Sequence, residues 1–210
     1  MKKFQFSSFL IFLIFNIPNV QCFKIDRAIV SSDNNPMYLD FWPIVARAWK
    51  EIIGIKPTLA LIADKSVIVD ESLGDVIRFE PIPTISTALY SQVIRLLIPA
   101  YFPDDVSITS DIDMIPINRE YFINSVKDIP EDHFVVYRDA AYNSSLNQFP
   151  ICYNAAKGII FKEIFQIKQL SDIPKIVMNW AQTEFGWFTD EKMLYKCLTN
   201  WNKYHTQCTK

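Results

Sequence analysis

The segment SITSDIDMIPINREYF, residues 107–122, places two aspartates one residue apart in an otherwise apolar stretch. Side chains at positions i and i+2 of an extended chain point to the same side, so Asp111 and Asp113 are predicted to share a face. Two carboxylates held together repel one another unless a cation lies between them. Magnesium and manganese bind one or two such carboxylates and complete their coordination with water and substrate phosphates. The pair is therefore either an ordinary acidic turn or a site for a divalent cation and a diphosphate.

The elements that must position these aspartates alternate between strand-like and helix-like segments. Short apolar runs predict strands, and apolar residues at helical spacing predict helices. The predicted strands cover residues 26–33, 57–64, 75–79, 106–113 and 133–139. The predicted helices cover residues 38–53, 86–102, 160–165, 173–182 and 189–198, with Ser86 and Thr189 as N-caps.

This alternation favours one α/β domain with a mostly parallel central sheet flanked by helices on both faces. In such sheets the ligand binds beyond the carboxyl ends of the strands. Asp33, Asp64 and the Asp111–Asp113 pair all fall at predicted strand ends. Their placement favours a binding site over an unrelated acidic turn.

The N-terminal segment MKKFQFSSFLIFLIFNIPNVQC has the layout of a secretory signal peptide, with basic residues, an apolar run and a cleavage point after Cys22. An uncleaved anchor is the alternative, but the run is shorter than the roughly 20 apolar residues that a spanning helix needs. We expect residues 1–22 to be removed and residues 23–210 to form the domain. The mature protein would then lie in the lumen of the secretory pathway (ER or Golgi) or outside the cell, with no membrane span, and the sequon at Asn143 would carry a glycan.

Charge and cysteine content bear on three possibilities: a nucleic-acid partner, a disulfide and a zinc site. The formal net charge of −2 gives no reason to expect a nucleic-acid partner. Cys197 and Cys208 are close enough in sequence to form a disulfide, and the apolar surroundings of Cys152 predict a buried free thiol. The spacing of the four cysteines matches no zinc site.

Four segments, taken in order, resemble the GT-A glycosyltransferases, and in particular a small family-8-like group that uses nucleotide-diphospho-sugars. The segment VSITSDIDMIPINREYF resembles their D-x-D segment, and SQVIRLLIPAYFPDD resembles the helix that precedes it. ICYNAAKG resembles the segment that lines the donor sugar, with alanine in place of the usual glycine, and GWFTDEKML resembles the start of an acceptor-side helix. The resemblance implies a GT-A fold and transfer of a hexose from a nucleotide-diphospho-sugar to an acceptor hydroxyl of a glycan, lipid or protein.

The resemblance also implies roles for individual residues on the donor side. Asp113 would be the main ligand of a Mn²⁺ or Mg²⁺ ion, and Asp111 would contact both the metal and the ribose. Ser31 and Asp33 would contact the nucleoside. Arg95 would brace the aspartates or the phosphates, the alternative for this residue being a surface salt bridge. The remaining donor contacts, to the sugar or the diphosphate, would come from Asn154 and Lys157.

On the acceptor side the resemblance implies Asp190 and Glu191. If the reaction inverts the anomeric configuration, Asp190 would be the catalytic base, with Glu191 as the second candidate. A retaining reaction would need no such base, and the sequence leaves the stereochemistry open. The alternative is that both carboxylates serve only the N-terminus of a helix, where the helix dipole favours negative charge. Relatives often place a metal-binding histidine late in the chain, but the surroundings of His205 match poorly and favour a surface residue.

Two other functions fit parts of the pattern. Haloacid-dehalogenase-type phosphohydrolases also use D-x-D after a strand, although usually the first strand of the chain. A non-catalytic relative could keep the fold and bind sugars through stacking of Trp180, Trp187 or Trp201, although most tryptophans in apolar surroundings belong to a core.

Overall fold

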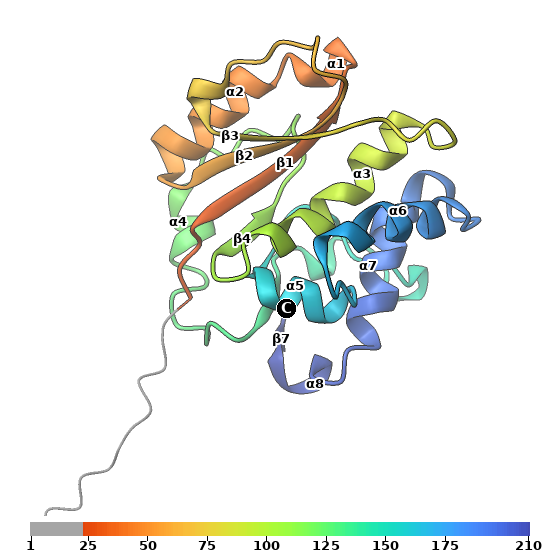
Figure 1. Ribbon diagram of the computed structural model, residues 1–210. Coiled ribbons are helices and arrows are strands. Elements are labelled where there is room, and N and C mark those ends of the chain that lie inside the picture. Colours follow the sequence, from red (N-terminus) through yellow and green to blue (C-terminus); the bar gives the residue numbers. More distant parts are fainter. Residues whose placement is uncertain (1–22) are drawn as a thin grey trace, which may run out of the picture.

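A seven-stranded sheet with the order β3-β2-β1-β4-β6-β5-β7 runs through the centre of the protein in the computed structural model (Figure 1). The structure describes residues 23–210. The predicted signal peptide and Cys22 lie outside the described residues. The strands are β1 (Arg27–Asp33), β2 (Lys56–Ile62), β3 (Asp75–Phe79), β4 (Val106–Thr109), β5 (Phe134–Val136), β6 (Asn154–Lys157) and β7 (Cys208–Thr209).

Helices cover both faces of the sheet (Figure 1). The α-helices are α1 (Pro36–Leu39), α2 (Trp42–Arg47), α3 (Thr87–Leu97), α4 (Arg119–Ile123), α5 (Gly158–Ile164), α6 (Ile173–Ala181), α7 (Thr189–Thr199) and α8 (Tyr204–Gln207). A π-helix, η1 (Ala48–Ile53), extends α2. Short 3₁₀ turns are η2 (Glu71–Leu73), η3 (Ile98–Tyr101), η4 (Asp139–Ala141), η5 (Ser144–Leu146), η6 (Leu170–Asp172) and η7 (Gly186–Phe188).

β1 lies inside the sheet because its apolar residues are buried on both faces. Ala28, Ile29 and Val30 have no exposed surface, as expected for a parallel strand covered by helices on either side. Ile29 packs with α3, α5, α6 and α7 in one core, whereas Ala28 and Val30 pack with α2, η1 and α4 in the other. The alternation of side chains along one strand thus divides the protein into two cores.

The register of the sheet brings the ends of β1 and β4 together. β1 pairs in parallel with β2 and β4, with Ile29 opposite Thr109. The amide of Ser110 donates to the Ile29 carbonyl at 2.9 Å, which extends the pairing one residue past β4. The chain after Ser110 therefore emerges on the side of the sheet where β1 ends. Ligands of parallel α/β sheets bind on this side, beyond the carboxyl ends of the strands. The prediction of a mostly parallel α/β sheet is confirmed.

Several element boundaries differ from the sequence prediction. The predicted helix 38–53 is broken into α1, α2 and η1, and Pro43 lies in the first turn of α2, where its missing amide hydrogen is tolerated. β4 ends at Thr109, so Asp111 and Asp113 lie in a turn rather than on an extended strand, as the bond from the Met114 amide to the Asp111 carbonyl shows. The sequence prediction also lacked β6, β7 and α4.

The three described cysteines have free thiols, so the pairing considered for Cys197 and Cys208 is not formed. Cys152 is buried, as predicted. Burial raises the pKa of the Cys152 thiol to about 12, and the neighbouring Asp111 acts in the same direction. The thiol therefore stays protonated at neutral pH. No helix within residues 23–210 has the length and apolar character needed to cross a membrane.

Candidate functional site

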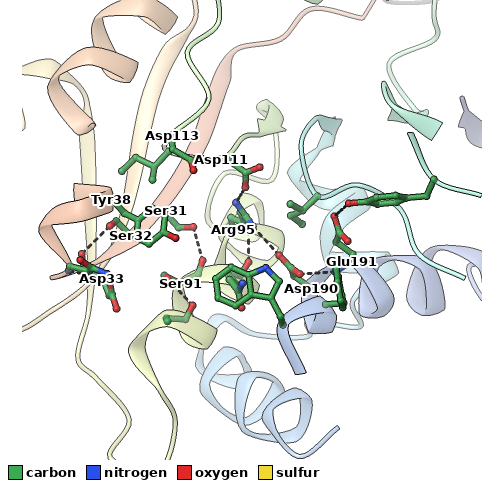
Figure 2. A pocket seen from close by; sticks show the side chains of 18 residues that line it. Ser31, Ser32, Asp33, Tyr38, Ser91, Arg95, Asp111, Asp113, Asp190 and Glu191 are labelled. Carbon is green, nitrogen blue, oxygen red and sulfur yellow. Dashed lines mark hydrogen bonds and ion pairs between the residues drawn. The ribbon is translucent and has the colours of Figure 1, made fainter. Parts of the chain in front are cut away.

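A pocket opens at the carboxyl ends of β1 and β4, between α1, α3 and the start of α7 (Figure 2). Its volume is about 270 Å³, slightly below the range of about 300–1,000 Å³ for small-molecule sites. Asp33 and Tyr38 lie toward one end and Asp190 and Glu191 toward the other, with Arg95 between them. The lining residues are Ser31, Ser32, Asp33, Asn35, Tyr38, Ala88, Ser91, Gln92, Arg95, Asp111, Ile112, Asp113, Tyr142, Ile151, Trp187, Phe188, Asp190 and Glu191.

Arg95 connects the two halves of this pocket. It lies on α3, which begins where the Ser86 side chain accepts a hydrogen bond from the Leu89 amide, so the predicted N-cap is confirmed. One guanidinium nitrogen forms an ion pair with Asp111, and the other donates to Asp190 Oδ2 at 2.9 Å. Only 7% of Arg95 is exposed. The alternative of a surface salt bridge is therefore wrong.

The electrostatic balance keeps Arg95 charged. Burial alone would lower the pKa of Arg95, but the two neighbouring carboxylates, Asp111 and Asp190, outweigh burial and raise it. A guanidinium buried with two carboxylates is stable only when its hydrogen bonds are satisfied. The Gln92 carbonyl accepts a further bond from Arg95 Nε at 3.1 Å. The side chain is thus fixed in one orientation under the pocket.

Ser31 and Asp33 hold the end of β1 against α3. The Ser31 hydroxyl donates to the Ser91 carbonyl at 2.6 Å. Asp33 accepts from the Thr87 hydroxyl at 2.7 Å and from the Asn35 amide at 3.1 Å. Both residues line the pocket, and their bonds also give them a structural role at the β1–α3 junction.

Asp111 and Asp113 enter the pocket from the turn that follows β4 (Figure 2). Asp111 is partly buried and paired with Arg95, whereas Asp113 is exposed. No cluster of three or more metal-binding side chains occurs within the part of the chain that the structure describes. Two hard carboxylate oxygens nevertheless fit Mn²⁺ or Mg²⁺ when a diphosphate and water supply the remaining ligands.

The charge of the lining supports this fit. Asp33, Asp111, Asp113, Asp190, Glu191 and Arg95 bring five carboxylates and one guanidinium to the pocket, a formal excess of four negative charges. A diphosphate would be repelled by such a lining unless a cation accompanied it. The negative lining therefore disfavours a free diphosphate and is compatible with a divalent cation.

Asp190 and Glu191 lie in the first turn of α7 and are both buried, with 3% and 8% of their surfaces exposed. Asp190 Oδ1 accepts a bond from the Glu191 amide at 2.9 Å, which serves the helix start. Glu191 accepts a 2.8 Å bond from the Tyr142 hydroxyl and a 3.3 Å bond from the Gln148 amide group. The expected N-cap at Thr189 is wrong, because Thr189 is already helical and its hydroxyl donates to the Gly186 carbonyl.

Burial changes the acidity of both carboxyl groups. Burial raises the pKa of Asp190, and the opposing effect of Arg95 does not cancel it. Burial also raises the pKa of Glu191. The nearby charge of Asp190 raises this pKa further, whereas the hydrogen bond from Tyr142 lowers it. A carboxylate with a raised pKa is a stronger proton acceptor than an exposed aspartate, which suits general base chemistry.

Asn154 and Lys157, which the sequence analysis placed near the donor, do not line the pocket. Asn154 is fully buried in β6, and its side-chain amide donates to the carbonyls of Pro150 and Ile151. β6 runs antiparallel to β4, so Lys157 pairs with Val106 at the far end of the strand and forms an ion pair with Glu131. His205 is exposed on α8 and does not line the pocket, in agreement with the prediction of a surface histidine.

Sequence reasoning missed several lining residues, notably Tyr38, Ser91, Gln92 and Tyr142. Ser91 and Gln92 precede Arg95 by four and three positions on α3, so the helical spacing from Arg95 could have identified them. Tyr142 comes from the segment between β5 and β6, lines the pocket and donates a hydrogen bond to Glu191. Local sequence carries no signal for such a contact.

Comparisons with known proteins bear on the fold of the chain. No protein-family model and no curated protein matches the chain. Among solved structures, the chain is similar to the glycosyltransferase GlyE of Streptococcus pneumoniae TIGR4, with a TM-score of 0.52 and 13% identity over 88% of the chain. Similarity to the apo form of GlyE has a TM-score of 0.49 at 13% identity, covering 85% of this chain and 44% of that one. The bifunctional glycosyltransferase WbbM, in its apo structure, matches with 12% identity over 88% of the chain and a TM-score of 0.46.

The chain spans 44% of the length of GlyE and 38% of the length of WbbM. At 13% identity the likeness to GlyE shows a shared fold. The expected glycosyltransferase fold, with a mostly parallel sheet flanked by helices, is confirmed. The similarity supports no assignment to the family-8-like group.

Proposed function

We propose that the protein is a metal-dependent glycosyltransferase that moves a hexose from a nucleotide-diphospho-sugar to an acceptor hydroxyl. One observation carries the proposal. Arg95 ties Asp111 of the D-x-D turn to Asp190 of α7 beneath a single pocket. This connection joins the carboxylates expected on the donor side to those expected on the acceptor side, within a fold that GlyE shares.

On the donor side, Asp113 would hold a Mn²⁺ or Mg²⁺ ion together with Asp111, and Ser31 and Asp33 would contact the nucleoside. The cation would supply charge neutralisation for the departing diphosphate. Asp113 suits the principal contact because it is exposed, whereas the Asp111 carboxylate is already shared with Arg95. Arg95 would orient Asp111 through the ion pair between them.

On the acceptor side, Asp190 would accept the proton of the attacking hydroxyl, with Glu191 as the second candidate. The acceptor oxygen would form a bond to the anomeric carbon as the bond from that carbon to the diphosphate oxygen breaks. The raised pKa of Asp190 favours this role. Glu191 is held by Tyr142 and Gln148 and therefore also fixes the segment that closes this end of the pocket.

The proposal about cellular location rests on the sequence of the N-terminal segment and on the sequon at Asn143. We propose that residues 1–22 direct the protein into the secretory pathway and that Asn143 is glycosylated. Asn143 is exposed, which supports this part of the proposal. Its side chain accepts a bond from the Ser145 amide in the turn before η5.

The proposal is tested by incubating the purified protein with Mn²⁺ and a panel of nucleotide-diphospho-sugars, and by measuring released nucleoside diphosphate. We expect release with at least one donor, its loss in the presence of EDTA, and its loss in Asp113→Asn. The control is Asp128→Asn, because Asp128 is an exposed aspartate outside the pocket. No release from any donor would contradict the proposal and leave a non-catalytic sugar-binding protein. Release of inorganic phosphate from simple phosphoesters would instead indicate a phosphohydrolase.

A further inference from the structure

Trp187 differs from the other four tryptophans of the chain in its exposure. Trp42, Trp49, Trp180 and Trp201 are at least 93% buried, as core tryptophans are, whereas 64% of Trp187 is exposed. Phe188, the next residue, is 46% exposed. Both side chains line the pocket beside Asp190. A large aromatic surface is thus left in water at the end of the pocket where the proposed acceptor binds.

The backbone presents these two aromatic residues in a defined turn. They belong to η7, which begins at Gly186 with a φ of 57°, in the left-handed region that favours glycine. The Thr189 hydroxyl donates to the Gly186 carbonyl at 2.7 Å, and the Phe188 amide donates to the Phe185 carbonyl at 3.3 Å. Trp187 therefore stands three residues before Asp190 on a turn that is bonded to the start of α7.

The charge of the other lining residues limits which ligands can bind against this aromatic surface. The lining carries a formal excess of four negative charges, which disfavours an anionic acceptor. The same carboxylates can accept hydrogen bonds from hydroxyl groups. A ligand that offers an apolar face to the indole and hydroxyls to the carboxylates is a neutral pyranose ring, and tryptophan suits contacts that are apolar on one side and wet on the other.

We propose that Trp187, with Phe188, forms an acceptor subsite for a neutral sugar ring, so that the acceptor is a glycan. This inference rests on the proposed function and deepens it. A lipid acceptor is less suited to the site, because a lipid chain needs a continuous apolar groove. Here Asp190 and Glu191 line the same pocket as Trp187 and Phe188 and interrupt its apolar surface.

The test compares three variants by steady-state transfer to a panel of neutral oligosaccharides, at saturating donor and Mn²⁺. Trp187→Leu keeps an apolar side chain but loses the flat aromatic face, and we expect its KM for the acceptor to rise about tenfold or more. Trp187→Phe keeps an aromatic face and should stay within about threefold of the wild type. Ile159→Ala is the control, because Ile159 is 51% exposed on α5 and lies outside the pocket. Donor KM should be unchanged in all three.

A second measurement separates failure of this inference from failure of the proposed function. Indole fluorescence is titrated with the same neutral oligosaccharides, in the presence of Mn²⁺ and a nucleoside diphosphate, for the wild type and Trp187→Phe. A saturable change in the wild type that is lost in Trp187→Phe supports the subsite even if no donor is turned over. Equal acceptor KM in Trp187→Leu and the wild type would overturn the inference, as would transfer only to lipid or peptide acceptors.

Discussion

The guanidinium of Arg95 donates to Asp190 Oδ2 at 2.9 Å, although the two residues lie 95 positions apart in the sequence. The same guanidinium pairs with Asp111. One buried cation therefore connects the D-x-D turn to α7, and its two carboxylate partners compensate for the hydration that Arg95 loses on burial. Stability and the geometry of the pocket both depend on this connection.

Replacing Arg95 with methionine should lower the free energy of unfolding by about 3–5 kcal/mol, because it leaves Asp190 buried without its counterion. Chemical denaturation measures this loss. Arg119→Met is the matched control, since Arg119 is exposed on α4, and should change the value by less than about 0.5 kcal/mol. A loss below about 1 kcal/mol in Arg95→Met would mean that the bridge behaves like an exposed ion pair.

The buried carboxyl group of Glu191 should give the protein a recognisable pH dependence. Its pKa in the folded state is raised above the ordinary value of 4.5, so the folded state retains the proton over a range of pH in which the unfolded state has lost it. The contribution of Glu191 to stability must then fall as the pH rises from about 4.5 through the folded-state pKa. Denaturation from pH 4 to pH 7 should show the stability of the wild type falling relative to Glu191→Gln. If the difference in unfolding free energy between the two proteins stays constant, or if the wild type gains stability relative to Glu191→Gln, the raised pKa of Glu191 is refuted.

Asp190→Asn should separate turnover from donor binding. Asparagine keeps a side-chain oxygen near the Glu191 amide but cannot serve as a base, so transfer to the acceptor should fall by about two orders of magnitude or more. Donor affinity should remain within a few fold, because Asp113 and the cation hold the donor. Equal losses in both quantities, or no loss in either, would remove Asp190 from the proposed mechanism.

Expression in a secretory host should yield a protein that lacks about 22 residues and carries one glycan at Asn143. Intact-mass spectrometry before and after glycosidase treatment measures both changes. Asn143→Gln supplies the control for the glycan. A secreted product that retains Met1 would contradict the signal-peptide prediction.

Sequence patterns predicted the elements that carry a clear apolar run or apolar residues at helical spacing. β1, β3, α3 and α7 have strong apolar runs or helical spacing, and all four begin or end within about two residues of the prediction. β6 was missed because the four residues Asn-Ala-Ala-Lys carry little apolar signal. They form a strand only because β4 and β5 lie on either side.

Sequence motifs identified four acidic residues of the candidate pocket and missed residues that distant segments bring to it. Asp111, Asp113, Asp190 and Glu191 line one pocket, as the ordered motifs implied. The resemblance of the segment ICYNAAKG placed Lys157 near the donor, but the antiparallel direction of β6 carries Lys157 to the opposite end of β4. The bond from Tyr142 to Glu191 depends on tertiary contact, which no local pattern encodes.

The most direct test of the proposed cation and diphosphate site is calorimetric titration with nucleoside diphosphates, with and without Mn²⁺. The wild type should bind at least one of them only when Mn²⁺ is present, because the excess of carboxylates repels the free diphosphate. Asp113→Asn should lose this metal-linked binding while folding normally, since Asp113 is exposed, and Asp128→Asn should keep it. Unchanged metal-linked affinity in Asp113→Asn, or equal binding with and without Mn²⁺ in the wild type, would contradict the account.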